Sequence, residues 1–156
     1  MATELERSYL AGVLDADGSI ALKQQRNGVL DLDIMVYNVN EPLMHWLEAT
    51  FGGHARSEKR KKYEHWRIRW VWSASGEAAC AVLATIRDYM IVKRPQADLA
   101  MEAWATREPT PRNVRRWSMP NIDAIIARRR DYVERMHNLN TIGGNGFKDV
   151  FEKGLK

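Results

Sequence analysis

Residues 9 to 20 read YLAGVLDADGSI, and the spacing of the apolar residues changes within this stretch. Upstream, Thr3 and Glu6 have the spacing of a capping box, which marks the start of a helix. Apolar residues then recur at helical spacing, which predicts a helix from about Glu4 to Leu14. Beyond Gly18 the period becomes two, as in a strand. The stretch therefore predicts a helix that passes directly into a β-strand.

Two aspartates, Asp15 and Asp17, follow the apolar part of this helix, where carbonyl groups already concentrate negative charge. A stripe of small residues, Ser8, Gly12 and Ala16, would allow a second helix to approach closely. Carboxylates brought together at such a contact need a cation or a proton between them, and Mg²⁺ prefers oxygen ligands. The pattern favours a metal site at a contact between helices. Two alternatives are that the aspartates only form a turn and that the stripe packs against the chain's own sheet.

The rest of the chain alternates between the periods of strands and helices. Residues 30–36 form a hairpin with the first strand through the turn residues RNG, and a second hairpin returns along residues 65–73. Helices are predicted over 41–51 after the cap Asn40, from about 77 to 89, over 96–105 and from about 121 to 138. The order α-β-β-α-β-β-α, followed by further helices, predicts an α+β fold with four antiparallel strands under helices.

The composition is that of one intracellular domain. With 156 residues and 45% hydrophobic content, the chain can bury one core. We expect a single domain over 1–156, with a core of about 4–106 and a helical extension of about 107–156. No apolar run or leader-like start directs it to a membrane, and the single Cys80 is best explained as a buried residue of a protein in a reducing compartment. A pI near 9.3 is compatible with nucleic acid without requiring it.

The stretch LAGVLDADG resembles the signature of the LAGLIDADG homing endonucleases, with Val13 and Leu14 as the two differences from the nonapeptide that names them. In topology the resemblance covers about Leu5 to Ala105. It implies a site-specific double-strand DNA endonuclease that uses Mg²⁺, with Mn²⁺ or Ca²⁺ as substitutes at the same site. The single copy of the motif resembles the homodimeric branch, in which the stripe Ser8, Gly12 and Ala16 would form the contact between the two chains. Such a dimer would cleave a long pseudo-palindromic target.

The resemblance also implies roles for residues around the motif. By position, Asp17 and the backbone carbonyl of Ala16 hold the metal, and Asp15 supports the end of the helix. Lys93, beside Pro95 at the start of a later helix, assists catalysis; the alternative is that it only interacts with the dipole of the preceding helix.

The resemblance further implies a residue that orders the waters of the active site. Asn38, at the end of the second strand, corresponds to it by position, with Asn40 as an alternative and a role in the turn equally open.

In the family the four-stranded saddle lies in the major groove of DNA, so strand residues opposite the core should face the bases. By alternation these are Ala21, Lys23, Gln25, Asp31, Asp33, Met35, Tyr37, Arg56, Glu58, His65, Arg67 and Arg69. Lysine and arginine can pair with guanine, glutamine with adenine, and a carboxylate with cytosine. The residues expected in the core of the last strand are Trp66, Ile68, Trp70 and Trp72, which alternate with His65, Arg67, Arg69 and Val71.

Two other functions are compatible with this fold. One is an RNA-binding maturase that helps an intron to splice, for which the partner is intron RNA, and the other is a noncatalytic DNA-binding regulator. Intact Asp17 and Lys93 favour the nuclease, because a regulator needs no carboxylate where the metal is held. The run RRR at 128–130 is interpreted either as a contact to flanking DNA or as a solvated surface.

Overall fold

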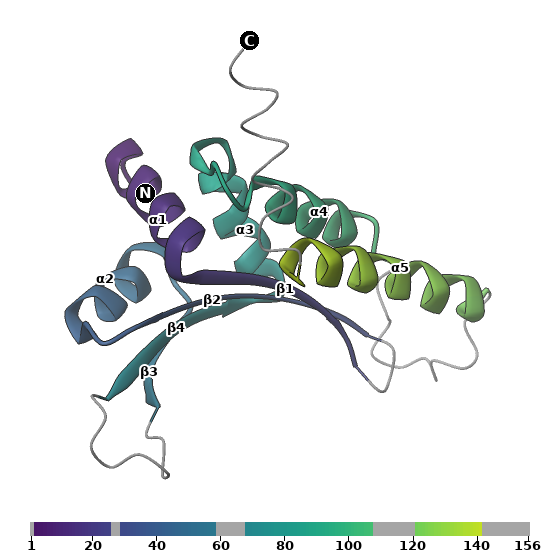
Figure 1. Ribbon diagram of the computed structural model, residues 1–156, viewed down its shortest axis with the longest axis horizontal. Coiled ribbons are helices and arrows are strands. Elements are labelled where there is room, and N and C mark those ends of the chain that lie inside the picture. Colours follow the sequence, from purple (N-terminus) through teal and green to yellow (C-terminus); the bar gives the residue numbers. More distant parts are fainter. Residues whose placement is uncertain (1, 26–28, 59–67, 108–120, 142–156) are drawn as a thin grey trace.

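Four antiparallel strands form a curved sheet that carries the helices on one face and leaves its concave face uncovered by them (Figure 1). The computed structural model describes residues 2–25, 29–58, 68–107 and 121–141. Within them the elements are α1 Glu4–Asp17, β1 Gly18–Gln24, β2 Leu30–Asn38, α2 Glu41–Phe51, β3 His54–Glu58, β4 Arg69–Ser75, α3 Gly76–Ile86, η1 Arg87–Tyr89, α4 Arg94–Ala105 and α5 Ile122–Thr141. The strand order is β1-β2-β4-β3. The predicted α+β fold is confirmed.

Helix α1 begins at the predicted cap but ends three residues later than predicted. The hydroxyl of Thr3 accepts from the amide of Glu6, and the Glu6 carboxylate accepts from the amide of Thr3, so the capping box is present. The helix continues to Asp17, and the prediction that it ends at Leu14 was wrong. A Cβ atom at Gly18 would lie 2.4 Å from the Leu14 side chain, so only glycine allows the chain to turn into β1 at this point. Both aspartates therefore belong to the last turn of α1.

The core lies between the sheet and the helical layer. Alternate residues of β1 and β2 are buried as predicted: Ile20, Leu22, Leu30, Leu32, Ile34 and Val36. Helix α1 adds Leu10, Ala11 and Leu14 to the same cluster. The register of the two strands, with Ile20 opposite Ile34, places these apolar side chains on one face of the sheet. The other face is consequently available for polar side chains.

Strand β4 confirms the predicted alternation and part of the predicted burial. Trp72 is fully buried on the core face, where it pairs with Val36, and its indole N–H donates to the carbonyl of Gly52 at 2.7 Å. Ile68, predicted to be core, is 52% exposed because it precedes the strand and lies beyond the last pair of β4 with β2. Val71 is buried although it lies on the opposite face, where its strand partners are Tyr37 and Arg56.

Helix α5 packs against the edge strand β1 and against α4. The amide nitrogen of Asn140 donates to the carbonyl of Ile20 at 3.0 Å, and that of Gln24 donates to the carbonyl of Ile126 at 3.3 Å. These bonds satisfy polar groups near a sheet edge that would otherwise be open to another strand. Arg129 is buried on the inner face of α5, so the middle of the RRR run is not a solvated surface. Among the described helices, none is long and apolar enough to span a membrane.

The corrected burial of β4 leads to a prediction with two isoleucines. Ile34→Ala should lower the free energy of unfolding by about 2–5 kcal/mol, because Ile34 is fully buried. Ile68→Ala should change it by no more than about 0.5 kcal/mol, because half of that side chain is already in water. Urea unfolding followed by circular dichroism measures both. Equal losses would show that Ile68 belongs to the core.

Candidate functional site

The end of α1 is fastened to the segment that leads into α4. The carboxylate of Asp15 accepts from three successive backbone amides, those of Ile91 at 2.7 Å, Val92 at 3.1 Å and Lys93 at 2.8 Å. In return, the ammonium group of Lys93 donates to the carbonyl of Leu14 at 2.8 Å and to that of Asp15 at 2.7 Å. We refer to these five bonds as the Asp15–Lys93 clasp.

The clasp explains why an acidic residue is tolerated at this helix end. The Lys93 ammonium places positive charge on two of the carbonyl groups that make a helix C-terminus negative. Burial lowers the pKa of Lys93 from its usual value, while the nearby carboxylates of Asp15 and Asp17 oppose that shift by stabilising the charged form. One alternative was that Lys93 only interacts with the dipole of the preceding helix, α3. The contacts do not support it, because the ammonium group of Lys93 binds carbonyl groups of α1.

Asp17 is held at the surface beside this clasp. Its side chain is exposed, and it makes no hydrogen bond or ion pair with any residue that the structure describes. It is nevertheless close enough to Lys93 to influence the charge of that group. Asp15 thus supports the helix end, as predicted, whereas Asp17 remains available to a ligand outside the chain.

The polar residues after β2 serve the turn into α2. The side-chain oxygen of Asn38 accepts from the amide of Asn40 at 3.0 Å, and that of Asn40 accepts from the amide of Leu43 at 3.0 Å. Asn40 is therefore the N-cap of α2. Asn38 has its oxygen in the turn, and only its amide nitrogen is without a partner in the described ranges.

A divalent metal fits this end of α1 only if some of its oxygen ligands come from water, from a substrate or from a second copy of the chain. The described residues contain no group of three or more His, Cys, Asp or Glu side chains that could hold a metal. Mg²⁺, however, is usually held by one or two carboxylates together with waters and substrate phosphates. Asp17 and the carbonyl of Ala16 supply part of such a set, and a second copy of the same helix end would supply the other carboxylate.

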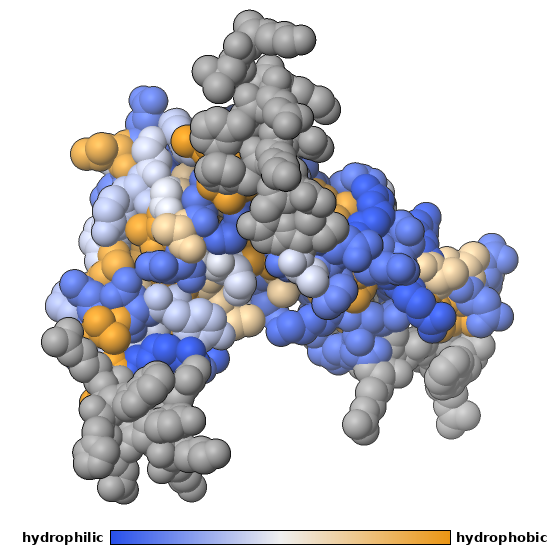
Figure 2. Space-filling model, viewed as in Figure 1, coloured by the Kyte–Doolittle hydropathy of each residue, from blue (hydrophilic) through white to orange (hydrophobic). Residues whose placement is uncertain are grey.

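The stripe on α1 is exposed and does not pack against the chain's own sheet. Ser8, Gly12 and Ala16 are exposed, and a Cβ atom at Gly12 would meet no atom within 4 Å. Two larger apolar residues on the same side are also exposed, Leu5 by 80% and Tyr9 by 50%. Figure 2 shows apolar and weakly polar surface over α1 and α2, in contrast to the mainly hydrophilic surface over α5.

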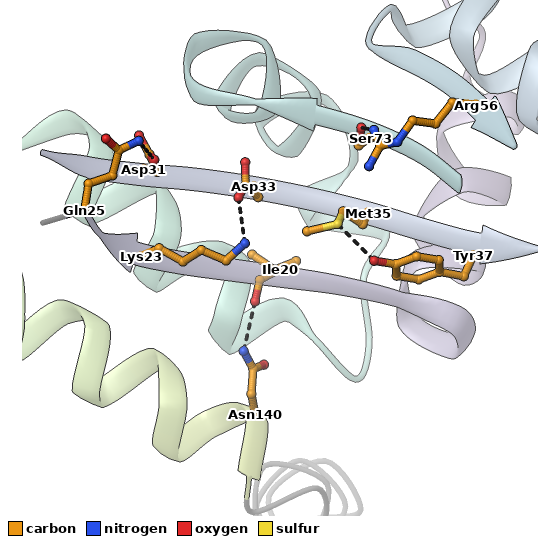
Figure 3. A network of polar contacts seen from close by, with 10 residues as sticks. All are labelled: Ile20, Lys23, Gln25, Asp31, Asp33, Met35, Tyr37, Arg56, Ser73 and Asn140. Atoms are coloured by element: carbon orange, nitrogen blue, oxygen red, sulfur yellow. Dashed lines mark hydrogen bonds and ion pairs between the residues drawn. The ribbon is translucent and has the colours of Figure 1, made fainter. Parts of the chain in front are cut away.

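The concave face carries paired polar side chains (Figure 3). On the hairpin of β1 and β2, Lys23 donates to the carboxylate of Asp33 at 3.0 Å, and the side-chain amide of Gln25, just after β1, donates to the carboxylate of Asp31. Toward the end of β2, the hydroxyl of Tyr37 contacts the sulfur of Met35 at 3.2 Å. These residues and Ala21 share one face of the hairpin, as the alternation predicted.

The same face continues over β3 and β4. Arg69 forms an ion pair with Glu58 and lies over the ring of Tyr37, 4.4 Å from its centroid. Arg56 donates to the hydroxyl of Ser73 at 3.2 Å. His65 and Arg67, which were predicted to share this face, lie outside the described residues. Ser73 was not predicted, although the alternation of β4 contained the signal for it.

The clasp leads to a prediction that separates the two aspartates. Asp15→Asn should lower the free energy of unfolding by about 1.5–3 kcal/mol, because an amide keeps one acceptor oxygen and turns an NH₂ group toward donors. Asp17→Asn, at the same helix end, should change it by about 0.5 kcal/mol or less, because it breaks no bond within the described structure. Chemical unfolding of both variants measures the difference. Equal stabilities for the two variants would contradict the clasp.

Solved structures of homing endonucleases share this fold. I-CvuI in complex with the I-CreI target in the presence of Mg has a TM-score of 0.68 at 16% identity, over 96% of this chain and 94% of that chain. The archaeal intron-encoded homing endonuclease I-Vdi141I, in complex with DNA, has a TM-score of 0.52 at 16% identity, over 83% of this chain and 97% of that chain. The LAGLIDADG homing endonuclease I-GzeII, in complex with its DNA target, has a TM-score of 0.55 at 12% identity, over 78% of this chain and 40% of that chain.

No family model matches the sequence, and no curated protein matches it. The likeness is therefore one of structure at low sequence identity, and it defines the fold. The motif stretch at the end of α1, the four-stranded curved sheet and the helical layer all agree with it. The chain has the fold of the LAGLIDADG homing endonucleases.

Proposed function

We propose that this protein is a site-specific double-strand DNA endonuclease that acts as a homodimer with a divalent metal. The observation that carries the proposal is the placement of Asp17. It is an exposed carboxylate without a partner in the described structure, and it is held by the clasp at the junction of α1 and the sheet. I-CvuI and I-Vdi141I, which share the fold, are seen in complexes with DNA.

The concave face of the sheet is the proposed surface for the duplex. The major groove admits a β-ribbon, and its bases present distinct donors and acceptors. Lys23, Arg56 and Arg69 supply donors on this face, and Asp31, Asp33 and Glu58 supply acceptors. The same face also carries an amide that both donates and accepts, a thioether and a phenol, from Gln25, Met35 and Tyr37. Such a mixture suits recognition of bases better than uniform attraction to phosphates.

A homodimer completes the proposed site. The exposed small stripe of α1 allows the same helix of a second copy to approach closely, and a two-fold contact would bring the two Asp17 carboxylates together. Twofold symmetry also requires that the target be nearly palindromic. One chain alone offers a single carboxylate, so the dimer is a condition of the proposed catalysis.

The proposed chemistry is hydrolysis of phosphodiester bonds. Asp17 and the backbone carbonyl of Ala16 would hold the metal, which when bound activates a water and stabilises the leaving oxygen. The ammonium group of Lys93 spends two of its three donors on carbonyl groups, which leaves one for a phosphate oxygen or a water. Asn38, with a free amide nitrogen in the described structure, can hold a water at the end of β2.

Selection of cleaved molecules from randomised duplexes in Mg²⁺ tests the proposed function and identifies the target. Recovery of a pseudo-palindromic sequence is the expected result. Binding of a duplex without cleavage in any divalent metal would indicate a regulator instead. Preference for a structured RNA over every duplex would indicate a maturase.

The role of Asp17 leads to a prediction on the selected target. Asp17→Asn should abolish cleavage and leave target binding within about threefold, because the amide preserves shape but removes the anionic metal ligand. Cleavage is measured on a labelled duplex in Mg²⁺, and binding is measured by anisotropy in Ca²⁺. Cleavage close to the wild-type rate would remove Asp17 from the active site.

The proposed dimer leads to a prediction for the stripe. Gly12→Leu should convert the dimer to a monomer and abolish cleavage. A side chain at position 12 meets no atom of its own chain, but in the proposed dimer it would occupy the space of the second α1 helix. The control is Ala127→Leu, which likewise adds a leucine side chain to an exposed helix position, in α5. Sedimentation velocity measures the oligomeric state of each. A dimeric Gly12→Leu variant would show that the contact lies elsewhere.

A further inference from the structure

The charges on the concave face cancel in the part of the sheet that the structure describes. The four strands contain the basic residues Lys23, Arg56 and Arg69 and the acidic residues Asp31, Asp33 and Glu58. A surface that binds DNA through phosphates alone gains from every basic residue and loses from every acidic one. The acidic residues therefore weaken general attraction to DNA, and their presence needs a reason connected with particular sequences.

Asp31 and Asp33 each accept a hydrogen bond from a donor that lies diagonally across the hairpin of β1 and β2. In the register of β1 and β2, Lys23 lies opposite Asp31, and Ala21 lies opposite Asp33. Lys23 nevertheless reaches diagonally to Asp33, and Gln25 reaches diagonally to Asp31 (Figure 3). Each contact thus joins a donor on the first arm of the hairpin, Lys23 in β1 or Gln25 just after it, to an acceptor of β2 two residues beyond the one directly opposite. Repetition of the diagonal places two donor–acceptor pairs side by side on the exposed face.

Each pair retains the capacity to bind something outside the protein. The ammonium group of Lys23 has three donors, and the carboxylate of Asp33 has several lone pairs, of which their mutual bond uses one each. The Lys23 side chain is 55% exposed, and that of Asp33 is 21% exposed. A ligand that approaches the sheet therefore meets a donor and an acceptor held next to each other.

A G·C base pair has the complementary arrangement in the major groove. Guanine offers two acceptors, O6 and N7, and cytosine offers a donor, the N4 amino group. On such a pair Lys23 can donate to guanine while Asp33 accepts from cytosine, and both remain satisfied. On a pair that turns an acceptor toward Asp33, the carboxylate is left facing negative charge. Adenine also has an amino donor, N6, but it offers the ammonium group only one acceptor, N7, where guanine offers two. The Lys23–Asp33 pair therefore favours G·C and penalises a pair that turns an acceptor toward Asp33.

We infer that Asp33 is a specificity-determining residue: with Lys23 it forms one donor–acceptor unit that favours a G·C base pair and opposes pairs that turn an acceptor toward the carboxylate. Asp31 and Gln25 form the corresponding unit at a second position. The inference rests on the proposed function, because it requires that the concave face binds duplex DNA. It adds that the acidic residues of this face lower affinity for random DNA and thereby raise discrimination.

Removal of the charge of Asp33 tests this inference without knowledge of the target. Asp33→Asn should bind a random-sequence duplex about two- to fivefold more tightly, the factor expected when an exposed ion pair releases its cation to a phosphate. The dependence of affinity on salt should steepen by about 0.9 in log–log slope, equivalent to one further phosphate contact. Fluorescence anisotropy in Ca²⁺ over a range of salt concentrations measures both quantities. In the Lys23→Met background, Asp33→Asn should raise the affinity for the random duplex by less, because no lysine is released.

The matched control removes an ion-paired carboxylate from the helical layer. Glu77, in the first turn of α3, pairs with Arg107 at 3.0 Å and is exposed. Glu77→Gln makes the same change in net charge and removes an ion pair away from the concave face, although the Glu77 carboxylate also accepts from the indole N–H of Trp104 at 3.1 Å. It should leave affinity for the random duplex and the salt slope unchanged. This control separates a local effect of Asp33 from the effect of total charge.

Selection of targets with each variant gives the second readout. Asp33→Asn should lose the preference for G·C at one position in each half-site, and Asp31→Asn should lose a preference at a different position. Unchanged target preference, or random-duplex affinity no higher than wild type, would overturn the inference. If Asp33→Asn fails to fold in an unfolding experiment, Asp31→Asn tests the inference through target preference alone, because its partner Gln25 carries no charge to release. If the wild-type protein binds no duplex at all, the proposed function fails instead.

Discussion

The Asp15–Lys93 clasp is the contact on which the candidate site depends. A helix that ends in two carboxylates is electrostatically unfavourable, since its last carbonyl groups already concentrate negative charge. The clasp offsets this cost in two ways, because three backbone amides bind one carboxylate and an ammonium group binds two carbonyls. Hydrogen bonds to charged groups are worth more than neutral ones, so the five bonds make a firm joint between α1 and α4. Asp17 can then stay exposed and without an internal partner.

The clasp also separates the roles of the two aspartates, which stand close together in the motif. Asp15 faces inward to the segment before α4, and its bonds are with backbone groups of this chain. Asp17 lies two residues on, at the last position of α1, immediately before the glycine that lets the chain enter β1. One aspartate therefore maintains the structure, and the other is presented at the surface. In the proposed endonuclease the second becomes the metal ligand.

The two faces of the sheet also have different roles: one packs against the helices, and the other carries polar side chains. The even-numbered residues of β2 from Leu30 to Val36 are buried in the core, and the odd-numbered residues from Asp31 to Tyr37 form polar contacts on the concave face. Helix α5 binds the outer strand through Asn140 and covers part of the sheet edge. The concave face is therefore the broad polar surface of the sheet that the described helices leave open (Figure 1). Its balanced charges suit selective contacts with bases more than general attraction to phosphates.

The sequence by itself determined the order of the elements and the two faces of the sheet. Capping residues, glycines and the change of period from 3.6 to 2 are local signals, and they correctly indicated α1, the first hairpin, α2 and α5. The face of each strand residue followed from alternation, including the polar face of Lys23 and Arg69. The motif singled out Asp15 and Asp17, the family resemblance added Lys93, and the structure places the three residues near one another.

Only the tertiary structure decided how deeply residues are buried and which polar groups meet. Alternation assigns Ile68 and Val71 to faces, but their exposure depends on where β2 ends and on side chains from neighbouring strands. Arg129 looked like part of a charged surface, and it is buried because α5 turns that position toward the core. The amides that bind Asp15 lie more than seventy residues away in the chain. Contacts of this kind leave no local signal, because backbone amides are the same in every sequence and only folding brings particular ones to a carboxylate.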